Sequence, residues 1–453
     1  MSITCVPSYT NGSELSERRI ACLIGPDRMR IIFYSHYYPP EVNAPASRTS
    51  EHCRLWAQAG HDVTVVTSAP NHPRGVIYPG YKNKLFQIEM MDGVKVVRVW
   101  TILAANEGFS RRTLNYASFM LSAALAIPRL PRPDIVVSTS PQFFCGLTGL
   151  VASLMRRAPW VLEVRDLWPE SIITVGAMRN GYVTRILERL ERLAYRNADR
   201  IVSLTDSFVA HIAERCQGAG KIDVIKNGVD LSLFKKRKDG EIAKRKFGFE
   251  GRVVAAYVGT HGMAHGLDTV LEAAVALRDD QRIGFLLVGD GAERSRLVER
   301  AEALKLDNLR IVGQLPKSDM PVIWAATDIS MILLRRRDTF KKVLPSKMFE
   351  AMAVGCPIVL GVEGEAKVLL EEAGAGIAIT PESAEELAAA VVKLADDRAL
   401  AACLGDRGAA HVRQHHDRAK LAMRYLAVLA QTVAEHGRAR KVGASHLTRA
   451  NTK

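Results

Sequence analysis

The sequence has no hydrophobic run long enough to cross a membrane and no recognisable export signal. Its longest uncharged apolar stretches, Tyr116–Pro128 and Phe143–Met155, are well short of the roughly 20 residues that a helix needs to span a bilayer. Residues 1–28 lack the basic start, apolar middle and cleavage pattern of a secretory signal. We therefore expect a cytoplasmic protein, which could still lie on the inner face of the cytoplasmic membrane.

Paired cysteines and paired acids are missing as well. The seven cysteines are scattered singly without a CxxC pair, which favours reduced thiols over a disulfide framework or a zinc cluster. No Asp-X-Asp triplet occurs, although enzymes that hold a sugar nucleotide through a divalent ion often use one to bridge metal and phosphate oxygens. We expect no metal site and no cofactor, with phosphate neutralised by Lys, Arg and helix dipoles.

Aromatic residues are scarce, which bears on the kind of anionic partner that this basic chain binds. The net charge of +14 indicates an anionic partner such as nucleic acid, anionic lipid headgroups or a pyrophosphate compound. Aromatics make up only 6% and no aromatic-rich basic stretch occurs, so we expect no nucleic acid. Part of the excess charge lies in residues 437–453, a basic segment without acids that is predicted to be disordered.

The chain does contain two successive alternations of predicted strands and helices. Its 453 residues exceed what one hydrophobic core usually serves, so two domains are expected. Strands separated by helices imply parallel sheets with right-handed crossovers, and ligands of such sheets bind beyond the carboxyl ends of the strands. We predict an α/β protein of GT-B architecture, with two Rossmann-like, doubly wound domains facing across a cleft. The predicted boundaries are 1–28 (extension), 29–228 (first domain), 229–416 (second domain), 417–436 (C-terminal helix) and 437–453 (tail).

The most informative motif is LPSKMFEAMAVGCPIV, over Leu344–Val359. Ser346 can cap a helix that opens with Lys347 and carries Glu350 one turn later. Free N–H groups at a helix start and a lysine can bind an anion, while a carboxylate can accept both hydroxyls of a ribose. The motif fits a nucleoside diphosphate, although a capped amphipathic helix with solvated charges would have the same pattern.

Several polar loops follow other predicted strands. The glycine-rich turn VGTHGMAHG, over Val258–Gly266, would let the backbone approach phosphate, but such turns are common. In EVRDLWPES, Asp166 could orient or deprotonate an acceptor hydroxyl, or it could form an ion-pair network with Arg165 and Glu170. In SHYYPPEVNAPASR, Arg48 could meet phosphate or acceptor from the first turn of a helix.

With these residues in view, the chain resembles glycosyltransferase family 4, the retaining GT-B enzymes. The likeness extends from Met29 to about Glu435, and the segments that carry it are FYSHYYPPEVNAPASRT, VRDLWPES, VIKNGVDLSLF, VGDGAER and LPSKMFEAMAVGCPIV. Within the family, the chain is most similar to transferases of O-antigen, capsule and exopolysaccharide assembly, including the fucosaminyltransferase-like branch.

The resemblance implies a nucleotide-sugar donor, usually UDP-linked, in the second domain and an acceptor in the first. Glu350 matches the ribose-binding glutamate of the family, Lys347 would lie beside the diphosphate, and Asp166 lies near the place where many relatives have a histidine. We take Asp166 and Glu350 as the catalytic candidates. The other donor-binding candidates are Gly259, Thr260, His261, Gly262, His265, Gly289, Gly313, Leu315 and Lys347. The acceptor-binding candidates are Asn43, Arg48 and Arg165.

The sequence departs from the family pattern at three places. The family often has a second glutamate eight positions before the ribose-binding one, where this chain has Lys342. It often has an Arg and a Lys in the turn that here reads Thr260–His265, and it has paired glycines where this chain has Asn43-Ala44. The missing positive charge could come from Lys347, Arg336 or Arg337.

The expected reaction is transfer of a sugar from UDP to a lipid-linked saccharide, with retention of configuration, and the leading hypothesis for the sugar is an N-acetylated amino sugar. An anionic membrane surface would suit such an acceptor, because arginines flank both apolar stretches of the first domain, although an ordinary core helix would have the same pattern. Two alternatives remain: a sugar-nucleotide 2-epimerase on the same fold, whose acid and histidine pattern is not found, and a non-catalytic nucleotide-binding protein.

Overall fold

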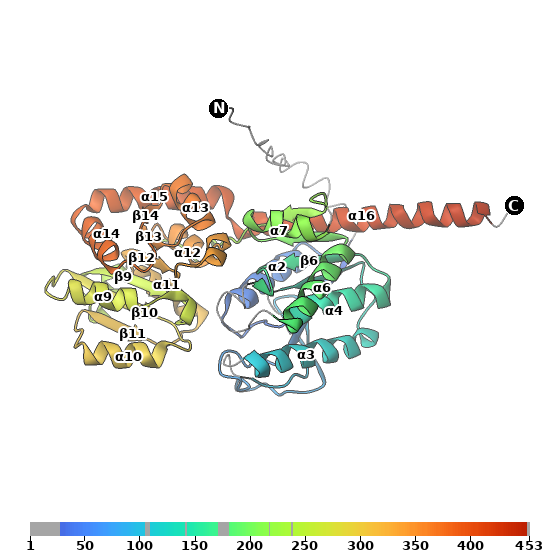
Figure 1. Ribbon diagram of the computed structural model, residues 1–453, viewed down its shortest axis with the longest axis horizontal. Coiled ribbons are helices and arrows are strands. Elements are labelled where there is room, and N and C mark those ends of the chain that lie inside the picture. The colour runs from blue at the N-terminus through green and yellow to red at the C-terminus, as the bar shows by residue number, and fades with distance from the viewer. Residues whose placement is uncertain are drawn as a thin grey trace, which may run out of the picture.

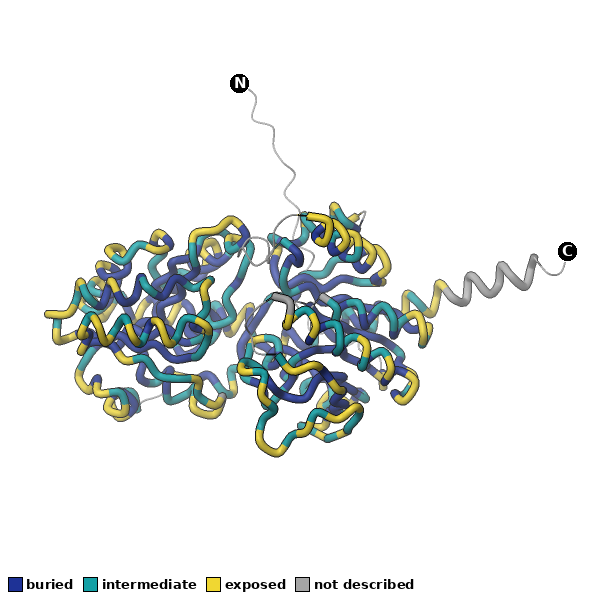
Figure 2. Tube along the Cα trace, turned by 60° about the horizontal axis from the view of Figure 1, so that its bottom comes forward, coloured by how far each residue is buried: buried dark blue, intermediate teal, exposed yellow. Residues whose placement is uncertain are grey.

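The computed structural model describes residues 28–104, 109–140, 143–170, 181–216, 218–236 and 239–450 as two α/β domains that lie side by side (Figure 1). The predicted fold class is confirmed, because each domain is a mostly parallel sheet with helices packed on both faces. Figure 2 shows the strands buried inside both domains and the exposed positions on the surrounding helices. Of the predicted extension, only Arg28 is among the described residues.

The sheet of the first domain has eight strands in the order β3-β4-β2-β1-β5-β6-β7-β8. The strands are β1 (Arg30–Tyr34), β2 (Asp62–Ser68), β3 (Phe86–Met91), β4 (Val94–Val99), β5 (Ile135–Thr139), β6 (Trp160–Val164), β7 (Arg200–Ser203) and β8 (Ile222–Val224). All pair in parallel except β3, which pairs antiparallel with β4 at the edge. The edge strand β3 was not predicted, because its half-exposed residues lack the continuous apolar run of a buried parallel strand.

Helices cover both faces of this first sheet. One face packs against α3 (Phe109–Ala126), α4 (Phe143–Arg156), α6 (Tyr182–Asn197) and α7 (Ser207–Cys216). The other face packs against α2 (Ala44–Gln58) and, from the far end of the chain, α16 (Arg418–Ala450). The loops at the carboxyl ends of β1, β2 and β6 point toward the second domain, as three contacts described below show.

The second domain has six parallel strands in the order β11-β10-β9-β12-β13-β14. The strands are β9 (Val253–Val258), β10 (Ile283–Val288), β11 (Leu309–Val312), β12 (Ile329–Leu333), β13 (Ile358–Gly361) and β14 (Gly376–Ala378). The helices are α8 (Gly240–Arg245), α9 (Asp268–Ala276), α10 (Arg294–Ala303), α11 (Met320–Ala325), α12 (Lys347–Ala353), α13 (Glu365–Ala373), α14 (Ala384–Asp396) and α15 (Arg398–His415), with short 3-10 turns η2 (Met263–His265) and η4 (Asp338–Lys342).

The chain passes between the domains twice, and the two passages lie against each other. Val229 on the outward passage forms a bridge with Asp417 on the return. After the return, α16 packs on α2, where the indole Nε1 of Trp56 donates to the carbonyl of Ala422 at 2.9 Å. The last helix is therefore part of the first domain's layer.

The disorder predicted for residues 437–453 is wrong as far as residue 450. Helix α16 continues without a break from Arg418 to Ala450, and residues 451–453 lie outside the described part of the chain. The physical reason is that the segment continues an existing helix, so no new nucleus is needed, and most of its residues are good helix formers.

Within the described residues, no helix is both long and apolar enough to cross a membrane. The same residues contain no group of three or more His, Cys, Asp or Glu side chains placed to hold a metal ion.

Candidate active site

The glycine-rich turn after β9 packs main chain against main chain on the turn after β10. Gly259 and Gly289 both have a positive φ, of 144° and 150°, and a Cβ on Gly289 would overlap the carbonyl oxygen of Gly259. The amide of His261 donates to the carbonyl of Asp290 at 2.9 Å, which ties the two turns together. The two turns therefore lie against each other, and only glycine fits at position 289.

Lys347 begins α12 and reaches into this paired turn. Its ammonium lies 3.5 Å from the centroid of the Tyr257 ring, and a Cβ on Gly259 would lie 2.9 Å from its Nζ. Among the residues that the structure describes, the Nζ has no hydrogen-bond partner, and burial lowers the pKa of Lys347 to about 7. A buried ammonium that makes no hydrogen bond is costly, and the π face of Tyr257 offsets only part of that cost.

The two histidines of the turn are neutral donors rather than cations. His261 has an exposed fraction of 0% and neither ring nitrogen has a partner in the described part of the chain, while the Nδ1 of His265 lies 3.4 Å from the carbonyl of Leu333. Burial, followed by the charge of Lys347, lowers the pKa of His261 to about 4 and that of His265 to about 3. The neighbouring Thr260 is exposed, and its carbonyl accepts from the Tyr257 hydroxyl at 2.9 Å.

Glu350 follows Lys347 on the same helix. Its Oε2 accepts from the indole Nε1 of Trp324, on α11, at 3.3 Å, which fixes the carboxylate beside the lysine turn. Ser346 does not cap the helix as predicted, because its φ of −60° is helical and its side chain makes no cap hydrogen bond. The amide groups at the start of α12 are therefore not satisfied by the serine.

The loop after β11 meets the first domain. Gly313 and Leu315, predicted donor contacts, flank Gln314, whose Nε2 donates to the carbonyl of Val42 at 3.2 Å. Leu315 packs its half-buried side chain on the core of the second domain. Gly262, the remaining predicted contact, precedes η2 in an extended conformation with φ −108°.

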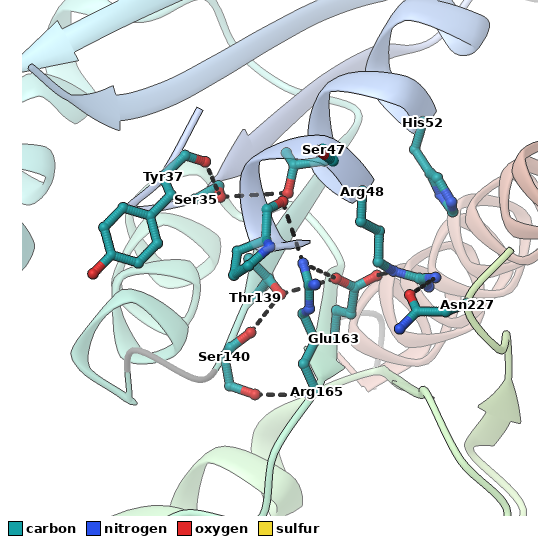
Figure 3. Close-up of polar contacts among 12 residues, drawn as sticks. Ser35, Tyr37, Ser47, Arg48, His52, Thr139, Ser140, Glu163, Arg165 and Asn227 are labelled. Atoms are coloured by element: carbon teal, nitrogen blue, oxygen red, sulfur yellow. Dashed lines mark hydrogen bonds and ion pairs between the residues drawn. The ribbon is translucent and has the colours of Figure 1, made fainter. Parts of the chain in front are cut away.

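In the first domain, Arg48 is buried with an exposed fraction of 1%. Figure 3 shows its contacts with Glu163 and Asn227. Its Nε donates to Glu163 at 3.0 Å, and its other nitrogens donate to the side chain of Asn227 and to the carbonyls of Ile225 and Lys226. These contacts engage Arg48 within the protein, and its predicted acceptor-binding role stays a prediction. The side chain joins α2 to β6 and to the passage between the domains, because those buried acceptors need a donor.

Arg165 and Asn43 also make contacts within the protein. Arg165 has 6% of its side chain exposed and donates to the carbonyl of Pro45 at 3.3 Å, and burial lowers its pKa to about 10. Asn43 caps α2, since its Oδ1 accepts from the amide of Ala46 at 2.8 Å. The amide nitrogen of Asn43 remains buried with no hydrogen-bond partner among the described residues, so this side chain keeps one donor for a ligand.

Asp166 lies on the loop after β6, where it lines a small cavity of the first domain together with Trp168, Glu191 and Tyr195. Glu170, on the same loop, forms an ion pair with Lys342 of the second domain at 3.2 Å. Glu170 also lies 3.3 Å from the Nδ1 of His211 in its own domain, so it has partners on both sides of the cleft. The network of Arg165, Asp166 and Glu170 stays a prediction.

Two carboxylates went unassigned from the sequence. Glu163 lies between Arg48 and Arg165; burial alone would raise its pKa, but the two arginines hold the pKa below its usual value. Glu41 accepts the amides of Asn71 and His72 at 2.9 Å each, and burial raises its pKa to about 7. Glu41 lies in a segment that carries the family resemblance and Glu163 directly precedes another, but only the tertiary contacts show that they are buried.

The second domain thus presents a lysine, two neutral histidines and glycine turns around one point, with a carboxylate one helical turn away. Amide, imidazole and ammonium donors can bind phosphate oxygens, and the carboxylate can accept from hydroxyl groups. The first domain faces this point with the loop of Asp166. The arrangement can hold an anionic, hydroxylated ligand between the domains.

Comparison with known proteins assigns both domains to glycosyltransferase families. Residues 43–228 match the family described as glycosyl transferase 4-like domain, and residues 239–411 match glycosyl transferases group 1. The chain is 25% identical over 375 residues to an Escherichia coli protein named as the colanic acid biosynthesis glycosyl transferase WcaI, covering 80% of this chain and 91% of that one.

Solved structures show the same fold. Sucrose-phosphate synthase from Thermosynechococcus elongatus superposes with a TM-score of 0.72 at 18% identity, covering 90% of this chain and all of that one. Anabaena HepE in complex with UDP superposes with a TM-score of 0.66 at 18% identity, covering 89% of this chain. The finer likeness to fucosaminyltransferases stays a prediction. The chain is a GT-B glycosyltransferase, built from a glycosyl transferase 4-like domain and a glycosyl transferases group 1 domain.

Proposed function

We propose that this enzyme transfers a sugar from a UDP-linked donor to a lipid-linked saccharide during assembly of a cell-surface polysaccharide. The observation that carries this proposal is the position of Lys347. Its buried ammonium lies against the glycine turn, has no hydrogen-bond partner among the described residues, and comes one helical turn before Glu350. Two relatives support the choice of donor and product, since WcaI is named for colanic acid biosynthesis and HepE was solved in complex with UDP.

The second domain would bind the sugar nucleotide through charged side chains and hydrogen-bond donors. Lys347 would meet the diphosphate, the imidazoles of His261 and His265 and the amides of the glycine turns would donate to it, and Glu350 would accept from the ribose hydroxyls. As the bond to the sugar breaks, negative charge grows on the diphosphate. A fixed ammonium in a buried site stabilises that charge more than it stabilises the bound donor, which accelerates the reaction.

The first domain would present the acceptor. Asp166 lies on the loop after β6, which contacts the second domain through Glu170 and Lys342, and we assign it the task of orienting or deprotonating the acceptor hydroxyl. The free amide nitrogen of Asn43 and the loop after β1 would contribute acceptor contacts. Retention and an N-acetylated amino sugar are proposed on the resemblance to family 4.

A membrane-bound acceptor suits one surface of the first domain. Helix α3 exposes Leu114, Leu121 and Leu125 along one stripe, with exposed fractions of 55%, 61% and 64%. The ends of α3 and α4 meet where Arg156 donates to the carbonyl of Leu130 at 3.0 Å. Exposed basic residues surround the stripe: Arg111, Arg129, Arg132 and Arg157. We propose that this α3 face lies on an anionic lipid surface.

The first experiment is calorimetric titration of the protein with UDP, ADP and GDP, repeated on Glu350→Ala. Loss of the two ribose contacts is expected to weaken UDP binding by about tenfold or more. Glu299→Ala, an exposed carboxylate on α10, is the matched control and should bind as the unmodified protein does. Equal UDP affinity in the Glu350 variant would overturn the ribose assignment, and no binding of any nucleotide would overturn the donor site.

A further inference from the structure

Helix α10 has three arginines, and Arg294 differs from Arg296 and Arg300 in its ion pairing. Arg296 forms ion pairs with Asp268 and Glu293, and Arg300 forms them with Asp268 and Glu272. Arg294, the first residue of the helix, has no ion-pair partner among the described residues, and its Nε is buried without a hydrogen-bond partner there. A buried guanidinium nitrogen without a hydrogen bond destabilises the folded protein, so this arginine is a candidate for binding a ligand.

The arginine is held at the paired glycine turns. The amide of Arg294 donates to the carbonyl of Gly291 at 3.1 Å, and the amide of Glu293 donates to that of His261 at 2.9 Å. A Cβ on Gly313 would lie 3.9 Å from a terminal nitrogen of Arg294. The side chain therefore extends from the β10 turn to the loop after β11, along the edge where the donor site lies.

Arg294 and Lys347 approach the glycine turns from two sides. Lys347 lies beside Gly259 from α12, and Arg294 lies beside Gly313 from α10. Burial is the main cause of the lowered pKa of His261; the charges of Lys347 and Arg294 lower it further, and the charge of Asp290 opposes them. The Asp290 carboxylate already pairs with Arg74 at 3.6 Å and accepts from the amide of Gly291 at 2.8 Å. Two cations repel each other, and an anion bound between them would offset that repulsion.

We propose that Arg294 is a second cationic contact for the diphosphate of the donor, on the side of the glycine turn opposite Lys347. This inference rests on the proposed function and names a binding residue for that site. The turn over 260–265 itself offers neutral imidazoles and amides, so a doubly charged diphosphate needs cations from outside it. Arg294 and Lys347 supply them from two different helices.

The test uses the full chain and three variants: Arg294→Gln, which keeps most of the stem and removes the charge, Arg294→Lys, which keeps the charge, and Arg296→Gln as the matched control. Calorimetric titrations with uridine, UMP and UDP separate the nucleoside from its phosphates. Thermal unfolding is measured with and without UDP, because a purely structural role would lower the melting temperature of the ligand-free protein.

The Arg294→Gln variant is expected to bind UDP about tenfold or more weakly, since a hydrogen bond to a charged group is lost, while uridine affinity stays within about twofold. Arg294→Lys should recover part of the loss, and Arg296→Gln should leave UDP binding unchanged. The ligand-free melting temperature of Arg294→Gln should not fall, because no ion pair is lost.

Three results would overturn the inference. One is UDP affinity unchanged in Arg294→Gln while Glu350→Ala abolishes it, which would leave the proposed function intact. Another is an equal loss for uridine and UDP, which would place Arg294 at the base. The third is a ligand-free melting temperature that falls as far in Arg294→Gln as in Arg296→Gln. A protein that binds no nucleotide at all would instead sink the proposed function, and this inference with it.

Discussion

Lys347 shows how burial sets the chemistry of a single residue. Its neighbours are the Tyr257 ring from β9, the neutral imidazoles of His261 and His265, and Glu350 on its own helix. Burial is the largest influence on its pKa, which falls to about 7, and the charge of Glu350 opposes that fall only in part. The lysine therefore loses its proton near neutral pH in the ligand-free enzyme.

UDP affinity is consequently expected to depend on pH. The anion binds the protonated lysine, so raising the pH removes the charge from the free site. With a pKa near 7, the protonated fraction falls from about one half at pH 7 to about one hundredth at pH 9, and affinity should fall by roughly fiftyfold. UDP keeps its own charge over this range, because phosphate has its second pKa near 6. The measurement is calorimetry across that range in buffers of different ionisation enthalpy, which also reports the proton taken up on binding.

The control for this prediction is Lys347→Arg. A guanidinium stays protonated throughout the range, so UDP binding to the variant should be nearly flat with pH. The same decline in the variant and the unmodified protein would show that another group causes it.

At the scale of single elements, α3 presents its apolar side to solvent as well as to the core. Its buried side packs on the first sheet through Phe119 and Ala123, and its outer stripe of Leu114, Leu121 and Leu125 has no covering element in the described structure. The double variant Leu121→Ser/Leu125→Ser should therefore lose about tenfold or more of its binding to anionic vesicles, because both side chains would no longer be buried in lipid.

A matched control exists in the same domain. Ile88 and Met90, on the edge strand β3, are exposed to 55% and 64% but lie outside the arginine-flanked face. Ile88→Ser/Met90→Ser should leave vesicle binding unchanged, and binding of the unmodified protein should weaken in high salt or with zwitterionic lipid. Equal flotation of both double variants would remove α3 as the docking face.

For the whole molecule, the facing loops of the two domains touch at four places among the described residues. Lys342 pairs with Glu170 at 3.2 Å, Arg74 pairs with Asp290 at 3.6 Å, and Gln314 donates to Val42. At the fourth place, the carboxylate of Glu365 accepts from the amides at the start of α7, at 3.1 and 2.9 Å. Lys342, Asp290 and Gln314 lie on or beside loops of the donor site. The arrangement is therefore a closed one, in which Lys342 and Glu170 hold the rim of the cleft together.

Charge reversal at Lys342 should open the cleft. A half-exposed ion pair contributes at most about 1 kcal/mol, so Lys342→Glu is expected to shift the open-to-closed ratio by about fivefold or more once repulsion from Glu170 is added. Small-angle X-ray scattering would report a larger radius of gyration. The double variant Lys342→Glu/Glu170→Lys should restore the compact form.

Lys341→Glu is the control for this prediction, because Lys341 pairs with Asp338 and Glu363 inside the second domain. An equal increase in the radius of gyration of this variant would mean that the change in net charge, rather than loss of the Lys342–Glu170 ion pair, opens the cleft.

Much of this molecule could be predicted from local pattern. Buried parallel strands are continuous apolar runs, so β1, β9 and β10 are visible in the sequence, and the α12 motif brings Lys347 and Glu350 to one helix by spacing alone. The half-exposed β3 and the unbroken α16 were missed, because edge strands alternate weakly and a basic, polar helix resembles a disordered tail.

The sequence by itself determined the fold class and the loops on which polar groups gather, since periodicity and glycine placement are local properties. Only the tertiary structure decided what each charged group meets. Arg48, one turn into α2, and Arg294, at the start of α10, both follow glycine- or proline-rich loops. Arg48 nevertheless pairs with Glu163 and donates to main-chain carbonyls 177 and 178 residues away, whereas Arg294 has no ion pair among the described residues. Pairing of charges depends on distances between segments far apart in the chain, and no spacing along the sequence encodes those distances.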